Sequence, residues 1–128
     1  MIDHIGFPVK DYARSRAFYA ATLAPLGFVP VMDVTREQTG GYEGTGFGPA
    51  GRPQFWIGTG PAGGGAMHIA FVAATRAAVD DFYRAALAAG ARDNGAPGLR
   101  PHYHANYYGA FVFDLDGHNI EAVCHAPA

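Results

Sequence analysis

The sequence predicts an α+β protein built from two copies of a βαβββ unit. The main observation is an internal repeat, in which His4-Ile5-Gly6-Phe7 matches His68-Ile69-Ala70-Phe71 at an offset of 68 − 4 = 64, half of the 128 residues. A glycine-rich stretch between the two copies, and the same succession of strand and helix patterns in each, support this fold class. The offset also aligns Phe18-Tyr19 with Phe82-Tyr83, Leu23 with Leu87 and Phe47 with Phe111.

The first half is expected to contain a strand, a helix and three further strands. Alternation over residues 2–9 predicts the first strand, and Asp11 offers an N-cap for a helix over residues 12–24. Pro25 and Gly27 end that helix. Glycine-rich turns separate three more predicted strands, over residues 28–35, 42–47 and 54–59.

The second half repeats this order. A strand is expected over residues 67–72. Thr75 then caps a helix, which runs to about residue 89 and ends at Gly90. A weaker strand is expected around residues 91–93, or nearer Leu99, and two clear ones over residues 107–114 and 119–125. We expect a single domain, with module 1 over about residues 1–60, a linker over residues 61–66 and module 2 over about residues 67–125. The linker is flexible enough to let the two modules exchange between chains.

Composition narrows the class of partner. The formal net charge is −2 and no basic run occurs, which argues against a nucleic-acid or membrane-surface protein. No apolar run approaches the roughly 20 residues that span a bilayer. The single cysteine, Cys124, cannot form an internal disulfide, and no secretory leader pattern is seen, so a cytoplasmic location is expected. The expected partner is a small-molecule substrate.

Strand parity brings three metal-ligating side chains to one face. In the matching strands, His4 and His68 share a face with small residues only, which leaves space beside each imidazole. In the last strand, Ile120 is expected to face the helices, so Glu121 faces the histidine side. Two imidazoles and one carboxylate form the facial triad that holds Fe(II), and the same set suits Mn, Ni, Zn or Co.

Three protein ligands leave coordination positions open, which favours catalysis over a closed structural site. The repeat also points to a fourth position, because 121 − 64 = 57, and that residue is Ile57, which cannot ligate. Parity turns Gln54 away from residue 57, although a register shift of one residue would bring it in. Taken singly, a strand histidine is usually a surface residue, and the ligand prediction depends on the repeat.

These residues resemble the vicinal-oxygen-chelate superfamily of glyoxalases, bleomycin-resistance proteins, fosfomycin-resistance enzymes and extradiol dioxygenases. The most specific match is the segment 111–121, which resembles the family's turn before the ligand glutamate, with Leu115 in place of the usual proline. The resemblance covers nearly the whole chain. It implies that paired modules form one eight-stranded open cup, that His4, His68 and Glu121 hold a divalent metal, and that the protein is a homodimer.

Among the members, an extradiol-dioxygenase-like enzyme acting on adjacent oxygens is the first expectation, since such enzymes use a two-histidine, one-glutamate set. The alternatives are a redox-neutral lyase or isomerase, a glutathione or thiol transferase, and a bleomycin-resistance-like protein whose aromatic cleft binds without catalysis. The segment 100–108 carries proton-transfer groups and aromatic rings, and an aromatic edge or dimer surface is the alternative reading. We predict His102, Tyr103, His104 and Tyr108 as catalytic, and Trp56, Ile57, Arg100, Tyr107 and Phe111 as substrate-binding.

Overall fold

The computed structural model describes residues 1–128 and contains two modules of the same topology, each with a four-stranded sheet. The strand orders are β1-β4-β3-β2 and β5-β8-β7-β6, with the first strand of each module parallel to its last. The first module contains β1 (Ile5–Pro8), α1 (Tyr12–Leu23), the 3-10 turn η1 (Ala24–Leu26), β2 (Val29–Val34), α2 (Arg36–Thr39), β3 (Gly44–Gly48) and β4 (Phe55–Gly58). The second contains β5 (His68–Val72), α3 (Arg76–Ala88), β6 (Arg92–Leu99), β7 (Tyr108–Phe113) and β8 (Asn119–Cys124).

Each long helix begins at the predicted cap. The side chain of Asp11 accepts a hydrogen bond from the Arg14 amide at 3.1 Å, and Thr75 accepts one from the Ala78 amide at 3.0 Å. After α1 and η1 the chain turns at Gly27, whose φ of 79° lies in the left-handed region that favours glycine. The α+β prediction with paired βαβββ modules is confirmed.

Two elements differ from the prediction. The weak strand is longer than either expected position, because β6 runs over Arg92–Leu99 with irregular pairing to β7. The short helix α2 was not predicted, although Thr35 and Gln38 form a capping box around its first turn, a recognisable sequence signal.

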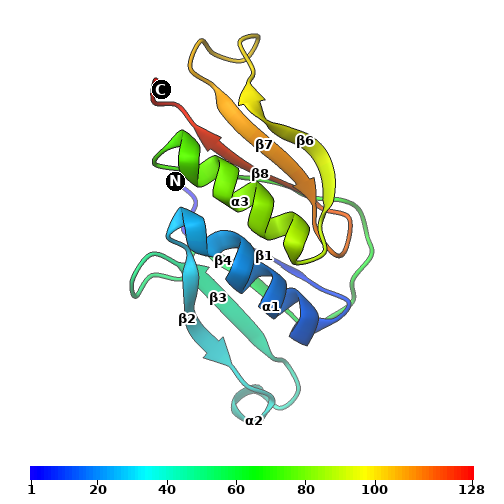
Figure 1. Ribbon diagram of the computed structural model, residues 1–128. Coiled ribbons are helices and arrows are strands. Elements are labelled where there is room, and N and C mark those ends of the chain that lie inside the picture. Colours follow the sequence, from blue (N-terminus) through cyan, green and yellow to red (C-terminus); the bar gives the residue numbers. More distant parts are fainter.

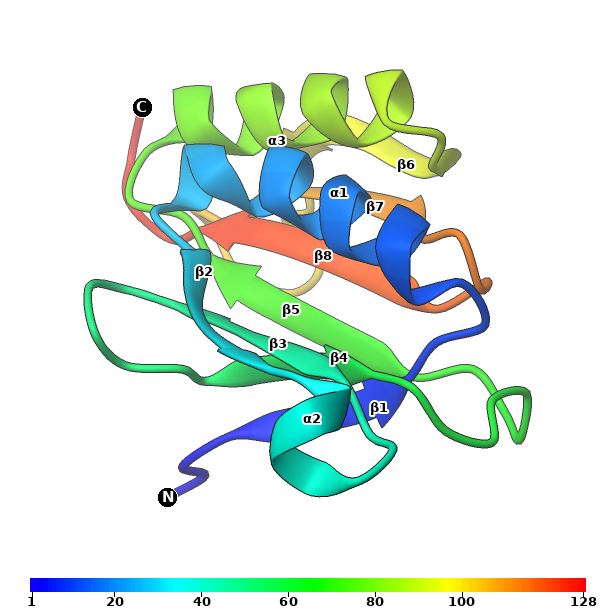
Figure 2. The same ribbon diagram turned by 90° about the horizontal axis from the view of Figure 1, so that it is seen from below.

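The two helices cover one side of the sheets and leave the other side open. Figure 1 shows α1 and α3 side by side, and Figure 2 shows both of them on the same side of the strands. The core lies between these layers and is rich in aromatic side chains. Its fully buried members include Phe18, Tyr19, Leu23, Phe47, Phe55, Ile57, Val79, Phe82, Val112 and Ile120.

The modules contact each other without sharing strand hydrogen bonds. The turn between β7 and β8 lies against the first module, where the Tyr19 hydroxyl donates to Asp114 and the Lys10 amide donates to Asp116 at 3.0 Å. The rings of Phe7 and His118 are in contact, tilted by 38° with centroids 4.2 Å apart. Burial and the Asp114 carboxylate raise the pKa of Tyr19 well above its ordinary value, which keeps this donor protonated.

We call the side of the sheets away from α1 and α3 the open face. It carries Gly6 and Trp56 in the first module and His68 and Glu121 in the second, because alternate residues of a strand point to opposite sides. The edge strands β1 and β5 are unpaired on their outer sides. No helix has the length and apolar character that a membrane span requires.

Candidate functional site

The parallel pair β5–β8 places a histidine and a glutamate together on the open face. His68 pairs with Asn119 in register and Ala70 pairs with Glu121, so both functional side chains point to the same side. The small Ala70 leaves room beside them. Ile120, between Asn119 and Glu121, is fully buried toward the helices, as strand parity predicts.

The imidazole of His68 is held in one orientation. Its Nδ1 atom lies 3.1 Å from the backbone carbonyl oxygen of Asn119, which can only accept, so Nδ1 carries the proton. The Nε2 atom lies 3.3 Å from Oε1 of Glu121. This arrangement directs the free Nε2 position at a carboxylate oxygen, as in metal sites where the second ring nitrogen is fixed by a backbone carbonyl.

Glu121 is 2% exposed and has no lysine or arginine partner. Its Oε2 atom instead accepts a hydrogen bond from the Tyr107 hydroxyl. Burial, followed by the hydrogen bond to Glu121, raises the pKa of Tyr107 to about 12, so this hydroxyl stays protonated at neutral pH and donates its hydrogen bond to the carboxylate.

These side chains line a hollow of about 420 Å³, here called the β8 hollow. Phe111 stacks on His68 with ring centroids 6.4 Å apart, and the Arg100 guanidinium lies 5.4 Å from the Phe111 ring centre. Arg100 donates to the carbonyl oxygens of Gly98 and Ala96, both at 2.8 Å. The β8 hollow is lined by His68, Tyr103, Tyr107, Phe111, Asn119 and Glu121.

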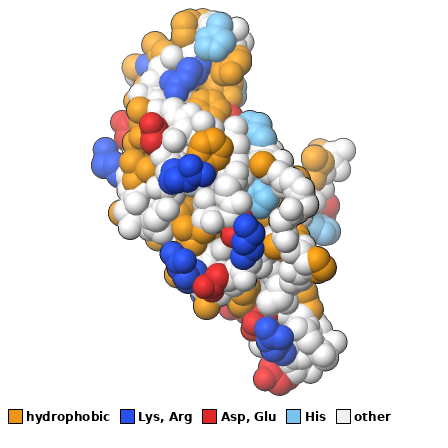
Figure 3. All heavy atoms as spheres, turned by 90° about the vertical axis from the view of Figure 1, so that its right-hand side faces the viewer, with side chains coloured by type: hydrophobic (Ala, Val, Ile, Leu, Met, Phe, Trp, Pro, Cys, Tyr) orange, Lys and Arg blue, Asp and Glu red, His pale blue; other side chains and the backbone are white.

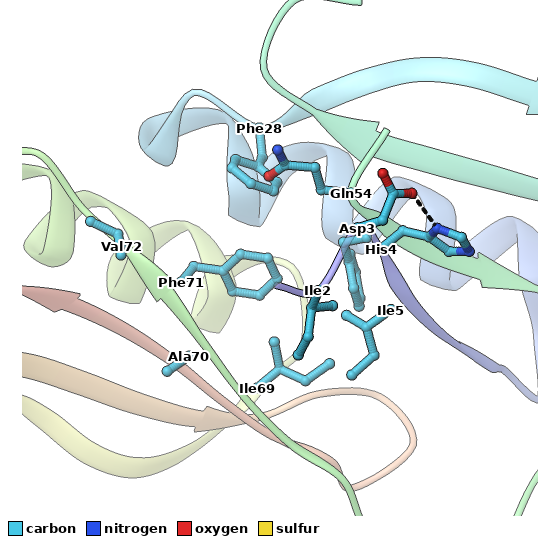
Figure 4. A pocket seen from close by; sticks show the side chains of 11 residues that line it. Ile2, Asp3, His4, Ile5, Phe28, Gln54, Ile69, Ala70, Phe71 and Val72 are labelled. Carbon is cyan, nitrogen blue, oxygen red and sulfur yellow. Dashed lines mark hydrogen bonds and ion pairs between the residues drawn. The ribbon is translucent and has the colours of Figure 1, made fainter. Parts of the chain in front are cut away.

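His4 lies apart from this pair. It precedes β1, its side chain is 59% exposed, and its Nδ1 atom is 2.7 Å from a carboxylate oxygen of Asp3. Figure 4 shows its ring beside Asp3, at the rim of a mainly apolar pocket that His4 lines together with residues such as Ile5 and Ile69. Within one chain, no three histidine, cysteine, aspartate or glutamate side chains gather in a way that could hold a metal ion.

Several residues predicted as catalytic lie away from the β8 hollow. The Tyr108 hydroxyl donates to Asp80 of α3 at 2.7 Å, so this side chain points to the helix side, and its predicted role is corrected. His102 and His104 are exposed in the loop before β7 and do not line the hollow. His104 packs against His125 instead, with ring centroids 5.7 Å apart. Tyr103 does line the hollow.

The register of β4 corrects the prediction for Ile57. In the first module Gly6 pairs with Trp56, whereas in the second Ala70 pairs with Glu121, so Trp56 takes the place equivalent to Glu121. Ile57 is fully buried toward the helices and cannot touch a substrate on the open face. The residue that replaces the fourth ligand is therefore an indole, and the first module still supplies no carboxylate there.

One contributor was not predicted as a site residue. Asn119 lines the β8 hollow and fixes the His68 ring through its backbone carbonyl, and its own Oδ1 atom is buried without a hydrogen-bond partner. A buried acceptor without a donor is uncommon and marks a place for a cation, a water or a ligand group. Asn119 pairs with His68, the second histidine of the repeat, and a parallel pairing of these two strands in the sequence analysis could have pointed to it.

The surface charge is mixed on the face of the molecule that Figure 3 draws. Figure 3 shows lysine, arginine and acidic side chains interspersed over one face, with histidines among them and no extended patch of either sign. This distribution agrees with the small net charge of −2 and gives no footprint for a polyanion.

The paired βαβββ modules, with a histidine–glutamate pair on the open face, define a protein of the vicinal-oxygen-chelate class. The chain belongs to the Glyoxalase/Bleomycin resistance protein/Dioxygenase superfamily, which it matches over residues 1–122. The comparison with curated proteins gave no match.

Solved structures of the same fold include proteins of different activities. The chain is 26% identical to a glyoxalase/bleomycin resistance protein from Albidiferax ferrireducens T118, with a TM-score of 0.76 and 98% of each chain covered. It is 20% identical to a mutant of the fosfomycin resistance protein FosX from Listeria monocytogenes, in complex with Mn(II) and 1S,2S-dihydroxypropylphosphonic acid, with a TM-score of 0.69 over 96% of this chain and 90% of that one. A glyoxalase I mutant from Zea mays is 20% identical, with a TM-score of 0.69 over 95% of this chain and 46% of that one. The last two likenesses concern the fold alone.

Proposed function

We propose that this protein is a divalent-metal-dependent enzyme that acts on a small substrate with adjacent oxygen atoms, with extradiol-type oxygenation as its reaction. The metal would be held by His68 and Glu121 of one chain and by His4 of a second copy. The observation that carries the proposal is the geometry of the His68–Glu121 pair.

In that pair, two electron-rich atoms face each other. Because Nδ1 of His68 donates to a carbonyl, Nε2 is the ring nitrogen left to face Oε1 of Glu121, 3.3 Å away, and without a proton it presents a lone pair there. Only a cation between them, a proton or a metal ion, makes this favourable. The buried Glu121 carboxylate also favours a positive charge beside it, and the partnerless Oδ1 of Asn119 could accept from a donor or bind a cation. An imidazole nitrogen and a carboxylate oxygen are ligands that suit Fe, Mn, Ni, Zn or Co. A second histidine would complete a two-histidine, one-carboxylate set, for which Fe(II) is the first choice.

The third ligand requires a second chain. His4 is the repeat counterpart of His68 and lies at an exposed strand end, yet it does not join the pair within its own chain. A homodimer with twofold symmetry pairs each unused histidine with the half-site of the other chain, which gives two identical sites. The exposed His4 side chain and the unpaired edges of β1 and β5 support this arrangement.

The chain's own groups suit this chemistry. A bound divalent metal would polarise the adjacent oxygens of the substrate and, as Fe(II), would allow reaction with O₂. Tyr107 keeps its hydroxyl proton beside Glu121. The rings of Phe111 and Tyr103 line the β8 hollow. Extradiol cleavage breaks the carbon–carbon bond beside the diol and places both atoms of O₂ in the product, so no external reductant is consumed.

Two measurements test the proposal. Protein purified without chelator should contain about one metal ion per chain, and Glu121→Gln should contain almost none; a metal-free wild type would overturn the metal site. After anaerobic loading with iron, a screen of catechols should show O₂ uptake that Glu121→Gln lacks. Metal content without uptake for any catechol would contradict oxygenation and would favour a redox-neutral reaction at the same site.

A further inference from the structure

The glycine-rich linker between the modules lies near the place where the two modules meet. Figure 1 and Figure 2 both show the chain between β4 and β5 at the same end of the molecule as the segment that joins β1 to α1 and the turn between β7 and β8. A polar hollow of about 210 Å³, here called the linker hollow, is lined by residues of these three segments. It shares no residue with the β8 hollow. Its lining residues are Lys10, Gly63, Gly65, Ala66, Asp116 and His118.

His118 supplies a hydrogen-bond donor at this hollow. The residue is only 8% exposed, and its ring contacts that of Phe7. Its Nδ1 atom accepts a hydrogen bond from the Met67 amide at 2.9 Å, so the ring proton is on Nε2. The ring makes no other hydrogen bond, so a buried side chain that lines the linker hollow keeps an N–H group without a partner. Such a donor calls for an acceptor in the hollow.

Lys10 and the linker add further donors. Lys10 is the only lysine of the chain, and its ammonium group makes no ion pair or hydrogen bond within the protein. The amides of Gly63 and Gly65 donate no hydrogen bond either. Gly63 has a φ of 111°, a backbone conformation that favours glycine. Free backbone amides, an ammonium group and an imidazole N–H around one small hollow favour an anion.

One carboxylate limits which anion fits. Asp116 also lines the linker hollow, and its Oδ2 atom accepts a hydrogen bond from the Lys10 amide at 3.0 Å. Its negative charge repels an anion that has only acceptor oxygens, but it accepts a hydrogen bond from an anion that carries a hydroxyl proton. Inorganic phosphate keeps at least one P–OH group at neutral pH, whereas sulfate, which has the same tetrahedral shape, has none.

We propose that the linker hollow binds inorganic phosphate in a protonated form. The phosphate oxygens accept hydrogen bonds from the Lys10 ammonium group, from Nε2 of His118 and from the linker amides, and the P–OH group donates to Asp116. Because the site takes residues from both modules and from the linker, bound phosphate stabilises the association of the modules within one chain by mass action. The site lies outside the proposed metal site and does not depend on the proposed function.

An NMR titration of isotope-labelled protein tests the site. The protein is first treated with chelator, so that no metal ion can hold the anion. Potassium phosphate should shift the amide resonances of Gly63 and Gly65 saturably, and potassium sulfate at the same ionic strength should leave them in place. Methyl phosphate is a monoester that has lost its P–OH proton at about pH 7.5, because its second pKa is about 6, and it should also leave them in place.

Two variants separate the roles of the charged residues. Lys10→Gln should weaken phosphate binding roughly tenfold, the loss of one charge-assisted contact. Asp116→Asn should bind sulfate about as well as phosphate, because the amide keeps an acceptor for the Lys10 N–H and removes the negative charge. Arg14→Gln, which removes an exposed cation that has no ion pair, is the matched control and should bind phosphate like wild type.

The proposal is overturned if phosphate leaves both glycine resonances unmoved, or if sulfate or methyl phosphate shifts them in the wild type as phosphate does. It is also overturned if Lys10→Gln binds phosphate as tightly as Arg14→Gln. Continued exclusion of sulfate by Asp116→Asn would contradict the part assigned to the Asp116 carboxylate.

Discussion

The Tyr107 hydroxyl donates a hydrogen bond to Glu121, and this is the contact that orients the only buried glutamate of the chain. Tyr107 lies in the loop before β7, whereas Glu121 lies within β8, so the contact fixes the carboxylate from outside its own strand. The free Oε1 atom is thereby left toward His68.

Tyr107→Phe should weaken binding of Mn(II) by roughly 10- to 100-fold, as expected when a partner of a metal-ligating carboxylate is removed. Equilibrium dialysis against Mn(II) measures this affinity. Tyr103→Phe is the control, because Tyr103 lines the same hollow but contacts the Tyr107 ring and not Glu121. Equal Mn(II) affinity in Tyr107→Phe and wild type would show that this contact does not orient a ligand.

Tyr19→Phe should lower the free energy of unfolding by about 1.5–3 kcal/mol, the contribution of a buried hydrogen bond to a charged group. The lost bond is the one between α1 and Asp114, which joins the two modules. Urea denaturation measures the change. Tyr83→Phe, which removes an exposed hydrogen bond to Asp93, should stay within about 0.5 kcal/mol of wild type. A similar loss in both variants would argue against a special role for the contact between modules.

Asp33→Asn should reduce the sensitivity of the fold to acid. Hydrogen bonds from Arg16 and Thr45 lower the pKa of Asp33. A lowered pKa means that the stabilisation is present above the unfolded value of about 3.9 and is lost as the pH falls through the folded value. The pair is about half exposed, so its contribution is below about 1 kcal/mol.

Thermal unfolding at a series of acidic pH values checks this prediction. The melting temperature of Asp33→Asn should fall less steeply below about pH 4 than that of wild type. Glu37→Gln, which removes an exposed carboxylate without an ion pair, should follow the wild-type curve. An unchanged slope in Asp33→Asn would contradict the lowered pKa.

The sequence was informative where local rules determine structure. The helix caps at Asp11 and Thr75, and the parity that turns Glu121 away from the helices, depend on residues close in the chain. The repeat added what no single segment contains, because it matched His4 with His68.

The sequence was less informative where pairing between distant strands determines which residues occupy equivalent positions. Ile5 pairs with Phe55, 50 residues later, whereas Ile69 pairs with Ile120, 51 residues later, so one extra residue in the second half moves the equivalent position from Ile57 to Trp56. Packing between distant elements also decides the side to which Tyr108 points and the separation of His4 from the His68–Glu121 pair. No local sequence pattern predicts either feature.

A mixture of His4→Ala and His68→Ala chains tests the shared metal site most directly. Each variant alone should bind no Mn(II), because every site in its homodimers lacks one ligand. When the two are unfolded together and refolded, each mixed dimer regains one intact site, so statistical pairing should restore about a quarter of the wild-type Mn(II) content. Co-purification through a tag on one variant shows that mixed dimers have formed. Mixed dimers that bind no more Mn(II) than either parent would contradict a site built from His4 of one chain and His68 and Glu121 of the other.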